Sequence, residues 1–217
     1  MLWNYISNTY LPGEPIVASD IDIDLSEVNK RRQFKLLTDS GKLSRFENGI
    51  YYIPKKSLLG GTVAIPPEIV VEKKYISRND KIMGYYSGYV FANKIGVSTQ
   101  MPFVQEIVTN EMGNPIKRLD YNGRTFIVRK ARCEITEENV YTLQFLELLK
   151  DIDAYSELPK EETRNKLSEY ISSKSITKEK VDNYLSLFPD KIYKSIYEMG
   201  LSNVFAWEQW IVRTSNF

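Results

Sequence analysis

The chain has 217 residues, 42% hydrophobic and 26% charged, which is typical of a folded protein with one large or two small domains. Its net charge of +1 gives no strong overall attraction to nucleic acid or membranes. Histidine is absent and Cys133 is the single cysteine, which excludes a Ser-His-Asp triad, a Cys-His pair, a histidine zinc site and an internal disulfide. Because no export signal and no apolar run of about 18 residues is present, we expect a cytoplasmic protein without a membrane span.

Charge is arranged in blocks along the chain. Residues 14–27 contain five acidic residues and no base, whereas residues 30–56 contain eight bases and two acids. Residues 73–132 are again basic, and residues 133–170 are acidic. A basic N-terminal half is expected of a chain that binds an anion there, although solvated faces of ordinary elements explain any single block equally well.

The first elements in the chain are short. A helix is expected over residues 1–10, and the Pro and Gly residues that follow it end the helix. Ile16-Val17 is a brief extended segment, and Ser19 caps a helical turn that runs to Asp24.

A basic helix is predicted next, over residues 27–40. Ser26 is a suitable N-cap, and Gly41 suits the position just after the C-terminal end. Phe34 and Leu37 are three residues apart and mark the buried face of this helix.

A two-stranded hairpin is predicted after the basic helix. Asn48-Gly49 separates two short alternating runs, and this dipeptide favours a tight turn in which both residues have positive φ. Helix, helical turn, basic helix and hairpin follow one another in the order of a winged helix-turn-helix. We therefore expect residues 1–56 to form such a DNA-binding domain.

The rest of the chain, residues 57–217, is expected to form a second domain, α+β over 57–132 and mostly helical over 133–217. Residues 55–67 resemble a linker, and the segment from Ile69 has no assigned type. The predicted elements that follow are a helix from Tyr85 to Ile95, a strand from Phe103 to Thr109, a hairpin around Asn122-Gly123, and helices over 137–152, 159–173, 177–187, 190–199 and 203–213. The expected fold class is therefore α+β, with an N-terminal winged helix-turn-helix, a mixed α+β domain and a helical C-terminal part.

The predicted basic helix, its hairpin and the residues just after it supply the candidate DNA contacts. Arg and Lys bind guanine edges or phosphates, and Asn and Gln can bind adenine. The candidates are Asn29, Lys30, Arg31, Arg32, Gln33, Lys35, Arg45, Lys55 and Lys56. Lys30 lies four residues before Phe34, on the inner side of the helix, where its side chain is expected to snorkel rather than to contact DNA.

Two segments resemble AbiEi-type antitoxins of the type IV, or abortive-infection, toxin–antitoxin systems. The first has the sequence RRQFKLLTDSGKLSRFENGIYYIPKK and resembles the winged-helix end of that family. The second, KIMGYYSGYVFANKIGVSTQMPFVQEIVTN, resembles its middle segment, and its GVSTQMP portion is the more specific match. With the hairpin that follows, the resemblance covers roughly residues 20–132.

The resemblance implies a phage-defence protein with two activities. It would repress its own operon by binding operator DNA through the N-terminal domain, with a possible homodimer on the DNA. Its C-terminal part would counteract a nucleotidyltransferase-like toxin, without necessarily binding that toxin directly. No catalytic residue, cofactor or metal is implied.

Three further groups of residues admit a functional or a purely structural interpretation. Ser98, Thr99 and Gln100 are candidates for a ligand pocket, or for a loop that caps neighbouring elements. The bases Arg124, Arg129, Lys130 and Arg132 either extend a nucleic-acid surface, meet an acidic partner, or form a solvated strand face. The carboxylates Glu134, Glu137 and Glu138 bind a metal only if the fold brings them together, and near a helix start they already favour its dipole.

Two alternatives to the antitoxin hypothesis remain open. A winged helix can dock a protein partner without binding DNA, and the accessibility of the basic helix distinguishes the two. A metal-dependent nuclease would require carboxylates that converge in a pocket.

Overall fold

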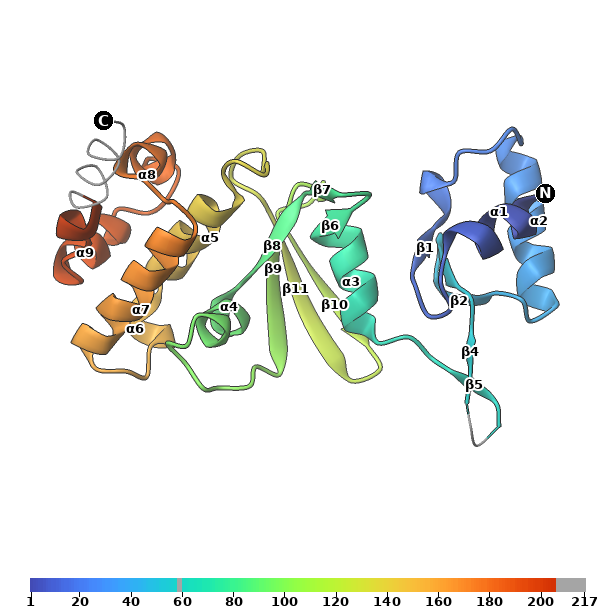
Figure 1. Ribbon diagram of the computed structural model, residues 1–217, viewed down its shortest axis with the longest axis horizontal. Helices are drawn as coiled ribbons and strands as arrows, with labels where there is room; N and C mark the ends of the chain where they lie inside the picture. The colour runs from blue at the N-terminus through green and yellow to red at the C-terminus, as the bar shows by residue number, and fades with distance from the viewer. Residues whose placement is uncertain (58–59, 206–217) are drawn as a thin grey trace, which may run out of the picture. The chain divides into compact units, whose positions relative to one another are not determined.

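The protein divides into two compact units in the computed structural model, which describes residues 1–57 and 60–205 (Figure 1). The N-terminal unit spans Met1–Lys74 and the C-terminal unit spans Tyr75–Phe217. Elements of the N-terminal unit are α1 (Leu2–Thr9), β1 (Ile16–Val17), the 3₁₀ turn η1 (Ala18–Asp20), α2 (Glu27–Asp39), β2 (Ser44–Glu47), β3 (Ile50–Tyr52), β4 (Lys55–Lys56), β5 (Thr62–Val63) and α3 (Pro67–Tyr75).

A small sheet and a hydrophobic cluster hold α1 and α2 together. The three antiparallel strands lie in the order β1-β3-β2. Buried side chains from both helices and the strands form the cluster: Leu2, Ile6, Ile16, Ile21, Phe34 and Leu43. The predicted marker Phe34 is 2% exposed, and its ring stacks on Tyr51 with centroids 4.4 Å apart. α2 is thus fixed through one face, which leaves the opposite face to solvent.

The boundary between the units lies later than residue 56, because α3 is fastened to the hairpin. Val70 of α3 joins Ile50 and Tyr52 of β3 in a second hydrophobic cluster. Lys74 forms an ion pair with Glu47, again between α3 and the hairpin.

The segment expected to be a linker contains a further hairpin. Lys55 and Lys56 of β4 pair antiparallel with Val63 and Thr62 of β5. These residues, which the sequence analysis assigned to a linker, form paired strands that belong to the N-terminal unit.

The hairpin at Asn48-Gly49 was predicted correctly, but its turn type was not. Gly49 has a φ of 79°, whereas Asn48 is not among the residues with positive φ. The turn still has two residues, because Glu47 pairs with Ile50, and the register shift between Arg45 and Glu47 is a separate bulge in β2. The second Asn-Gly pair does form the expected turn, with φ of 50° at Asn122 and 80° at Gly123.

A four-stranded mixed sheet is the centre of the C-terminal unit. Its strands lie in the order β10-β11-β9-β8, with β11 and β9 parallel and the other neighbours antiparallel. Elements of this unit are β6 (Ser77–Arg78), β7 (Lys81–Ile82), β8 (Gly84–Ser87), α4 (Gly88–Lys94), β9 (Val104–Thr109), β10 (Ile116–Tyr121), β11 (Arg124–Lys130), α5 (Val140–Leu149), α6 (Ile152–Tyr155), α7 (Lys160–Ser173), α8 (Lys178–Leu185) and α9 (Lys191–Glu198). The α+β class is as expected.

Helix α5 is the central helix of the C-terminal unit and is buried along nearly its whole length. It packs against β8 and contacts α4, α6, α8 and α9. The one amide in its core is satisfied twice: Gln144 Nε2 donates to the Tyr86 carbonyl at 2.7 Å, and Gln144 Oε1 accepts from the Tyr170 hydroxyl at 3.0 Å. Burial raises the pKa of Tyr170, which keeps this hydroxyl protonated as a donor.

One predicted helix differs from the structure, and another lies mostly outside the described residues. The helix expected from Tyr85 to Ile95 is a strand up to Ser87 and a helix only from Gly88 to Lys94. The helix expected over 203–213 lies mostly outside the described residues, which end at 205. Among the helices that the structure describes, none is long and apolar enough to cross a membrane.

Candidate nucleic-acid interface

Helix α2 has the local signals that the sequence predicted. The Ser26 hydroxyl accepts the backbone N–H of Asn29 at 3.4 Å and so caps the first turn. The helix ends at Asp39, and Gly41 follows with a φ of 70°. That conformation favours glycine, because glycine has no Cβ to clash with the backbone carbonyl.

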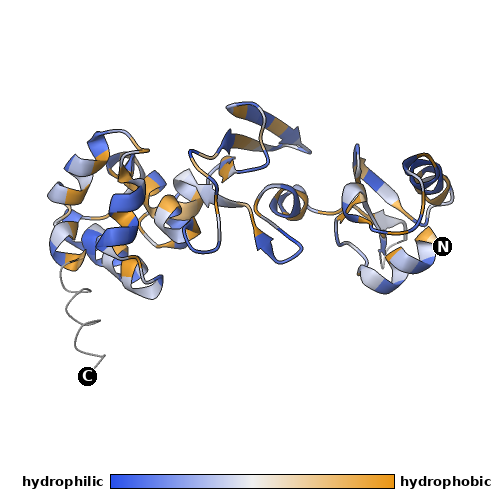
Figure 2. Cartoon of the chain, turned by 90° about the horizontal axis from the view of Figure 1, so that it is seen from above, coloured by the Kyte–Doolittle hydropathy of each residue, from blue (hydrophilic) through white to orange (hydrophobic). Residues whose placement is uncertain are grey.

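The outer face of α2 is basic and open to solvent. Arg31, Arg32 and Lys35 are all exposed there. Figure 2 shows α2 as a mainly hydrophilic helix, in contrast to α1. Two apolar side chains share this face, Val28 at 75% and Leu36 at 57% exposure, which the sequence analysis did not single out.

Two of the candidate DNA contacts on α2 are engaged within the protein. The Lys30 ammonium donates to the Ile21 carbonyl at 3.0 Å and to Glu27 at 3.1 Å, which agrees with its expected place on the inner side. Gln33 Oε1 accepts the backbone N–H of Leu2 at 3.3 Å. That N–H begins α1, which has no side-chain cap of its own, so Gln33 satisfies a donor that would otherwise lack a partner.

The hairpin contributes a fixed arginine. Arg45 Nη2 donates to the Asn48 side-chain oxygen at 2.7 Å, and Arg45 Nε donates to the Glu47 carbonyl at 3.3 Å. These bonds hold the exposed guanidinium over its own turn. Of the remaining candidates, Lys55 and Lys56 are exposed on β4, and Asn29 is exposed on the first turn of α2.

A surface hollow of about 500 Å³ lies beside the first half of α2. Lys30, Arg31 and Glu27 of α2 line one part of it, and Asn48 lines another. The hollow therefore lies between the helix and the hairpin turn, and both basic and acidic side chains line it.

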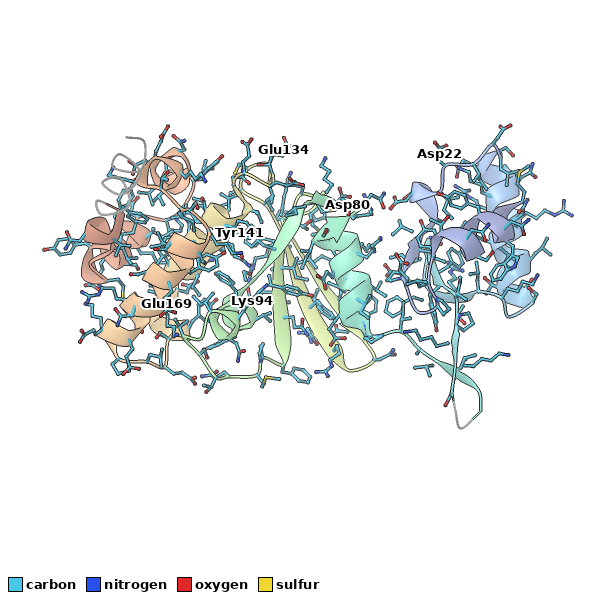
Figure 3. The ribbon with its side chains drawn as sticks, viewed as in Figure 1. Asp22, Asp80, Lys94, Glu134, Tyr141 and Glu169 are labelled. Carbon is cyan, nitrogen blue, oxygen red and sulfur yellow. The ribbon has the colours of Figure 1, made fainter. Side chains whose placement is uncertain are left out.

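Carboxylates lie next to the basic face. Asp22, labelled in Figure 3, and Asp24 are exposed on the segment between η1 and α2. Asp39 is exposed at the other end of the helix. The positive surface is therefore confined to the middle turns of α2.

The Ser98-Thr99-Gln100 motif is held by a single carboxylate, Glu157. Glu157 Oε2 accepts the Thr99 N–H at 2.6 Å, the Thr99 hydroxyl at 2.9 Å and the Ser98 hydroxyl at 3.3 Å. The Glu157 N–H in turn donates to the Val97 carbonyl at 2.9 Å. These contacts favour the structural interpretation, in which the motif closes the loop after α4.

We expect the hydrogen bonds between Glu157 and the Ser98-Thr99-Gln100 loop to weaken in acid. The backbone N–H of Thr99 and the side chains of Gln100, Thr99 and Ser98 hold the pKa of Glu157 below its usual value. A carboxyl with a lowered pKa stabilises the fold above its unfolded-state pKa of about 4.3, and this contribution is lost as pH falls through the folded-state pKa. The free-energy difference between wild type and Glu157→Gln should therefore be largest at neutral pH and vanish in acid. Carbon-13 NMR titration checks the pKa, and an ordinary glutamate value would contradict the prediction.

Two of the candidate arginines in the C-terminal unit are engaged in the fold. Arg129 forms an ion pair with Glu106 at 3.3 Å, and Arg132 stacks on Phe188 at 4.9 Å. Burial raises the pKa of the Cys133 thiol, which disfavours the thiolate form. Over residues 1–57 and 60–205, no group of three or more Cys, Asp or Glu side chains is placed to hold a metal ion, and this includes Glu134 and its neighbours.

Sequence comparison places both units in one family. A model described as a family of unknown function (DUF6088) matches residues 16–183, which is most of the chain. The chain belongs to this family. The DUF6088 match begins at the first residue of β1 and ends within α8, so it includes α2, its hairpin and the whole mixed sheet. No curated protein and no solved structure matches the chain.

Proposed function

We propose that residues 1–56 form a winged helix-turn-helix that binds operator DNA through α2. The observation that carries this proposal is the outer face of α2, where Arg31, Arg32 and Lys35 are exposed while Phe34 fixes the opposite face. The β1-β3-β2 sheet and the Arg45 hairpin beside this helix support the same assignment, because a wing contacts phosphates next to the groove that the helix enters.

The biological role that we propose follows from the resemblance to AbiEi-type antitoxins. The protein represses its own operon in the cytoplasm and counteracts a nucleotidyltransferase-like toxin encoded beside it. Two copies bind on the operator, because one helix offers few phosphate contacts and regulators commonly read paired half-sites. A gene for such a toxin next to this one would support the role, and its absence would weaken it.

A protein-docking role is the second candidate, and one observation favours it. Val28 and Leu36 expose apolar surface on the same face of α2 as the bases. Exposed apolar side chains are enriched at protein interfaces, whereas phosphate contacts require only the bases. A partner protein would bury both side chains, so Val28→Ser with Leu36→Ser would abolish docking and leave phosphate contacts in place.

Fluorescence anisotropy with the protein's own promoter fragment tests DNA binding directly. The expected result is a higher affinity for this fragment than for a scrambled one at the same salt concentration. Affinity should fall steeply with salt, because each neutralised phosphate contributes about 0.9 to the log–log slope. Equal affinity for both fragments, or no binding, would favour protein docking.

Arg45→Ala should weaken DNA binding by a similar factor for every sequence. Its guanidinium is held at the hairpin turn by Asn48, and an arginine on the proposed wing is expected to contact a phosphate rather than a base. Removal of one phosphate contact should reduce the salt slope by about 0.9. The measurement is anisotropy on promoter and scrambled DNA over a salt series. A loss restricted to the promoter fragment would instead place Arg45 at a base.

A further inference from the structure

The two edges of the mixed sheet differ in what lies beside them. At β8, helix α5 packs against the strand, and Gln144 donates to the Tyr86 carbonyl. At β10, the backbone pairs with β11 on one side. On its other side, β10 pairs with no strand within residues 1–57 and 60–205, because it is the outer strand of the sheet. Such an edge is able to pair with a further strand.

The register identifies which backbone groups point outward. Both ends of the β10–β11 ladder are hydrogen-bonded pairs. At one end the Lys130 N–H donates to the Pro115 carbonyl, and at the other Tyr121 pairs with Arg124 across the two-residue turn. Hydrogen-bonded pairs alternate with non-bonded pairs along an antiparallel ladder. The N–H and C=O groups of the alternate residues therefore point away from β11; these residues are Ile116, Arg118 and Asp120.

The side chains on this edge carry opposite charges two residues apart. Arg118 and Asp120 are 62% and 57% exposed, and Arg118 Nε lies 3.0 Å from Asp120 Oδ2. Charged side chains on an edge strand oppose pairing where like charges would lie directly across the ladder, and they favour it where opposite charges would. An Arg and an Asp at this spacing are complementary to the same strand in the opposite direction.

We propose that β10 pairs antiparallel with β10 of a second copy of this chain, with Leu119 opposite the partner's Leu119. Arg118 then lies opposite the partner's Asp120, and Asp120 lies opposite the partner's Arg118. These are the outward-pointing residues, so the two ladders form one continuous sheet. The neighbouring register, with Arg118 opposite the partner's Arg118, is disfavoured because like charges directly across a ladder repel.

The pairing is a property of the C-terminal unit and does not depend on the proposed DNA binding. Two short strands bury little surface, so the dimer is expected to be weak and concentration-dependent. Adjacent operator half-sites would strengthen it by raising the local concentration of the two copies.

Sedimentation analysis of the full chain without DNA tests the proposal with variants in which the charge of one residue is reversed. Wild type should dimerise as concentration rises, whereas Arg118→Glu alone and Asp120→Arg alone should remain monomeric, because each places like charges across the two-fold axis. An equimolar mixture of these two variants should form heterodimers, since both cross-strand pairs are then attractive. Lys130→Glu makes the same charge change on β11 and should dimerise like wild type.

Three outcomes would overturn the proposal. These are a wild type that stays monomeric at all concentrations, single variants that still dimerise, or a mixture that does not associate. Circular dichroism confirms that each variant is folded, which is expected because exposed ion pairs contribute little to stability. Anisotropy on the promoter fragment is measured separately, so loss of dimerisation and loss of DNA binding are distinguished.

Discussion

Reversal of Arg31 and Arg32 to Glu should abolish binding to the promoter fragment. Both side chains are exposed on the middle turns of α2, where a recognition helix contacts the groove. A specific arginine contact contributes about 1–3 kcal/mol, and the introduced glutamates add repulsion from phosphates. The affinity should therefore fall by at least about a hundredfold in anisotropy measurements.

A matched control distinguishes the effect of losing the α2 arginines from the effect of a lower net charge. Lys81→Glu with Lys94→Glu makes the same change in total charge on two exposed lysines of the C-terminal unit. This variant should bind DNA like wild type. The free energy of unfolding of both double variants should lie within about 0.5 kcal/mol of the wild-type value, because substitutions at exposed positions have small effects on stability. Retained binding by the Arg31/Arg32 variant would refute the recognition-helix assignment and favour protein docking.

Phe34→Ala should produce the largest loss of stability in the N-terminal unit. The ring is 2% exposed and stacks on Tyr51, so its removal leaves a cavity between α2 and the hairpin. Substitutions of this kind cost about 3–5 kcal/mol, a large part of the roughly 5–15 kcal/mol that stabilises a typical domain. The C-terminal unit should keep its structure, because its core includes none of the residues that pack around Phe34.

Hydrogen exchange measured by mass spectrometry resolves the two units. Amide protection should fall in α1, α2 and β3 and persist in α5. Leu36→Ala is the matched control, since it removes apolar atoms from the same helix at a position that is 57% exposed. It should change stability by less than about 0.5 kcal/mol. Unchanged protection of α2 in the Phe34→Ala variant would contradict the proposed role of this ring.

Elements with strong local signals were predicted from the sequence. α2 has a capping serine and a terminal glycine, and the hairpin β10–β11 has an Asn-Gly turn. The N-cap of α8 is Thr177, whose hydroxyl accepts the Lys180 N–H at 3.2 Å. Each signal depends on residues a few positions apart, so no knowledge of the tertiary structure is needed.

Strand β8, which depends on a distant partner, was not predicted. β8 is a four-residue segment with two adjacent tyrosines, and a short buried strand cannot be distinguished from a helix by periodicity alone. Its strand form depends on pairing with β9, about twenty residues later. The DNA candidates show the same limit, because Gln33 binds the N–H of Leu2, a contact that no local pattern indicates.

Lys30 also constrains how a duplex can approach α2. Its ammonium joins the Ile21 carbonyl to the first turn of the helix, so the segment bearing Asp22 and Asp24 is fastened to α2. For a duplex bound as proposed, these carboxylates repel the phosphates at one end of the helix, while Arg31 and Lys35 attract them further along. This uneven charge favours contact at the middle turns of α2 over contact at its first turn. The part of the helix that a duplex can reach is then limited by residues that touch no base.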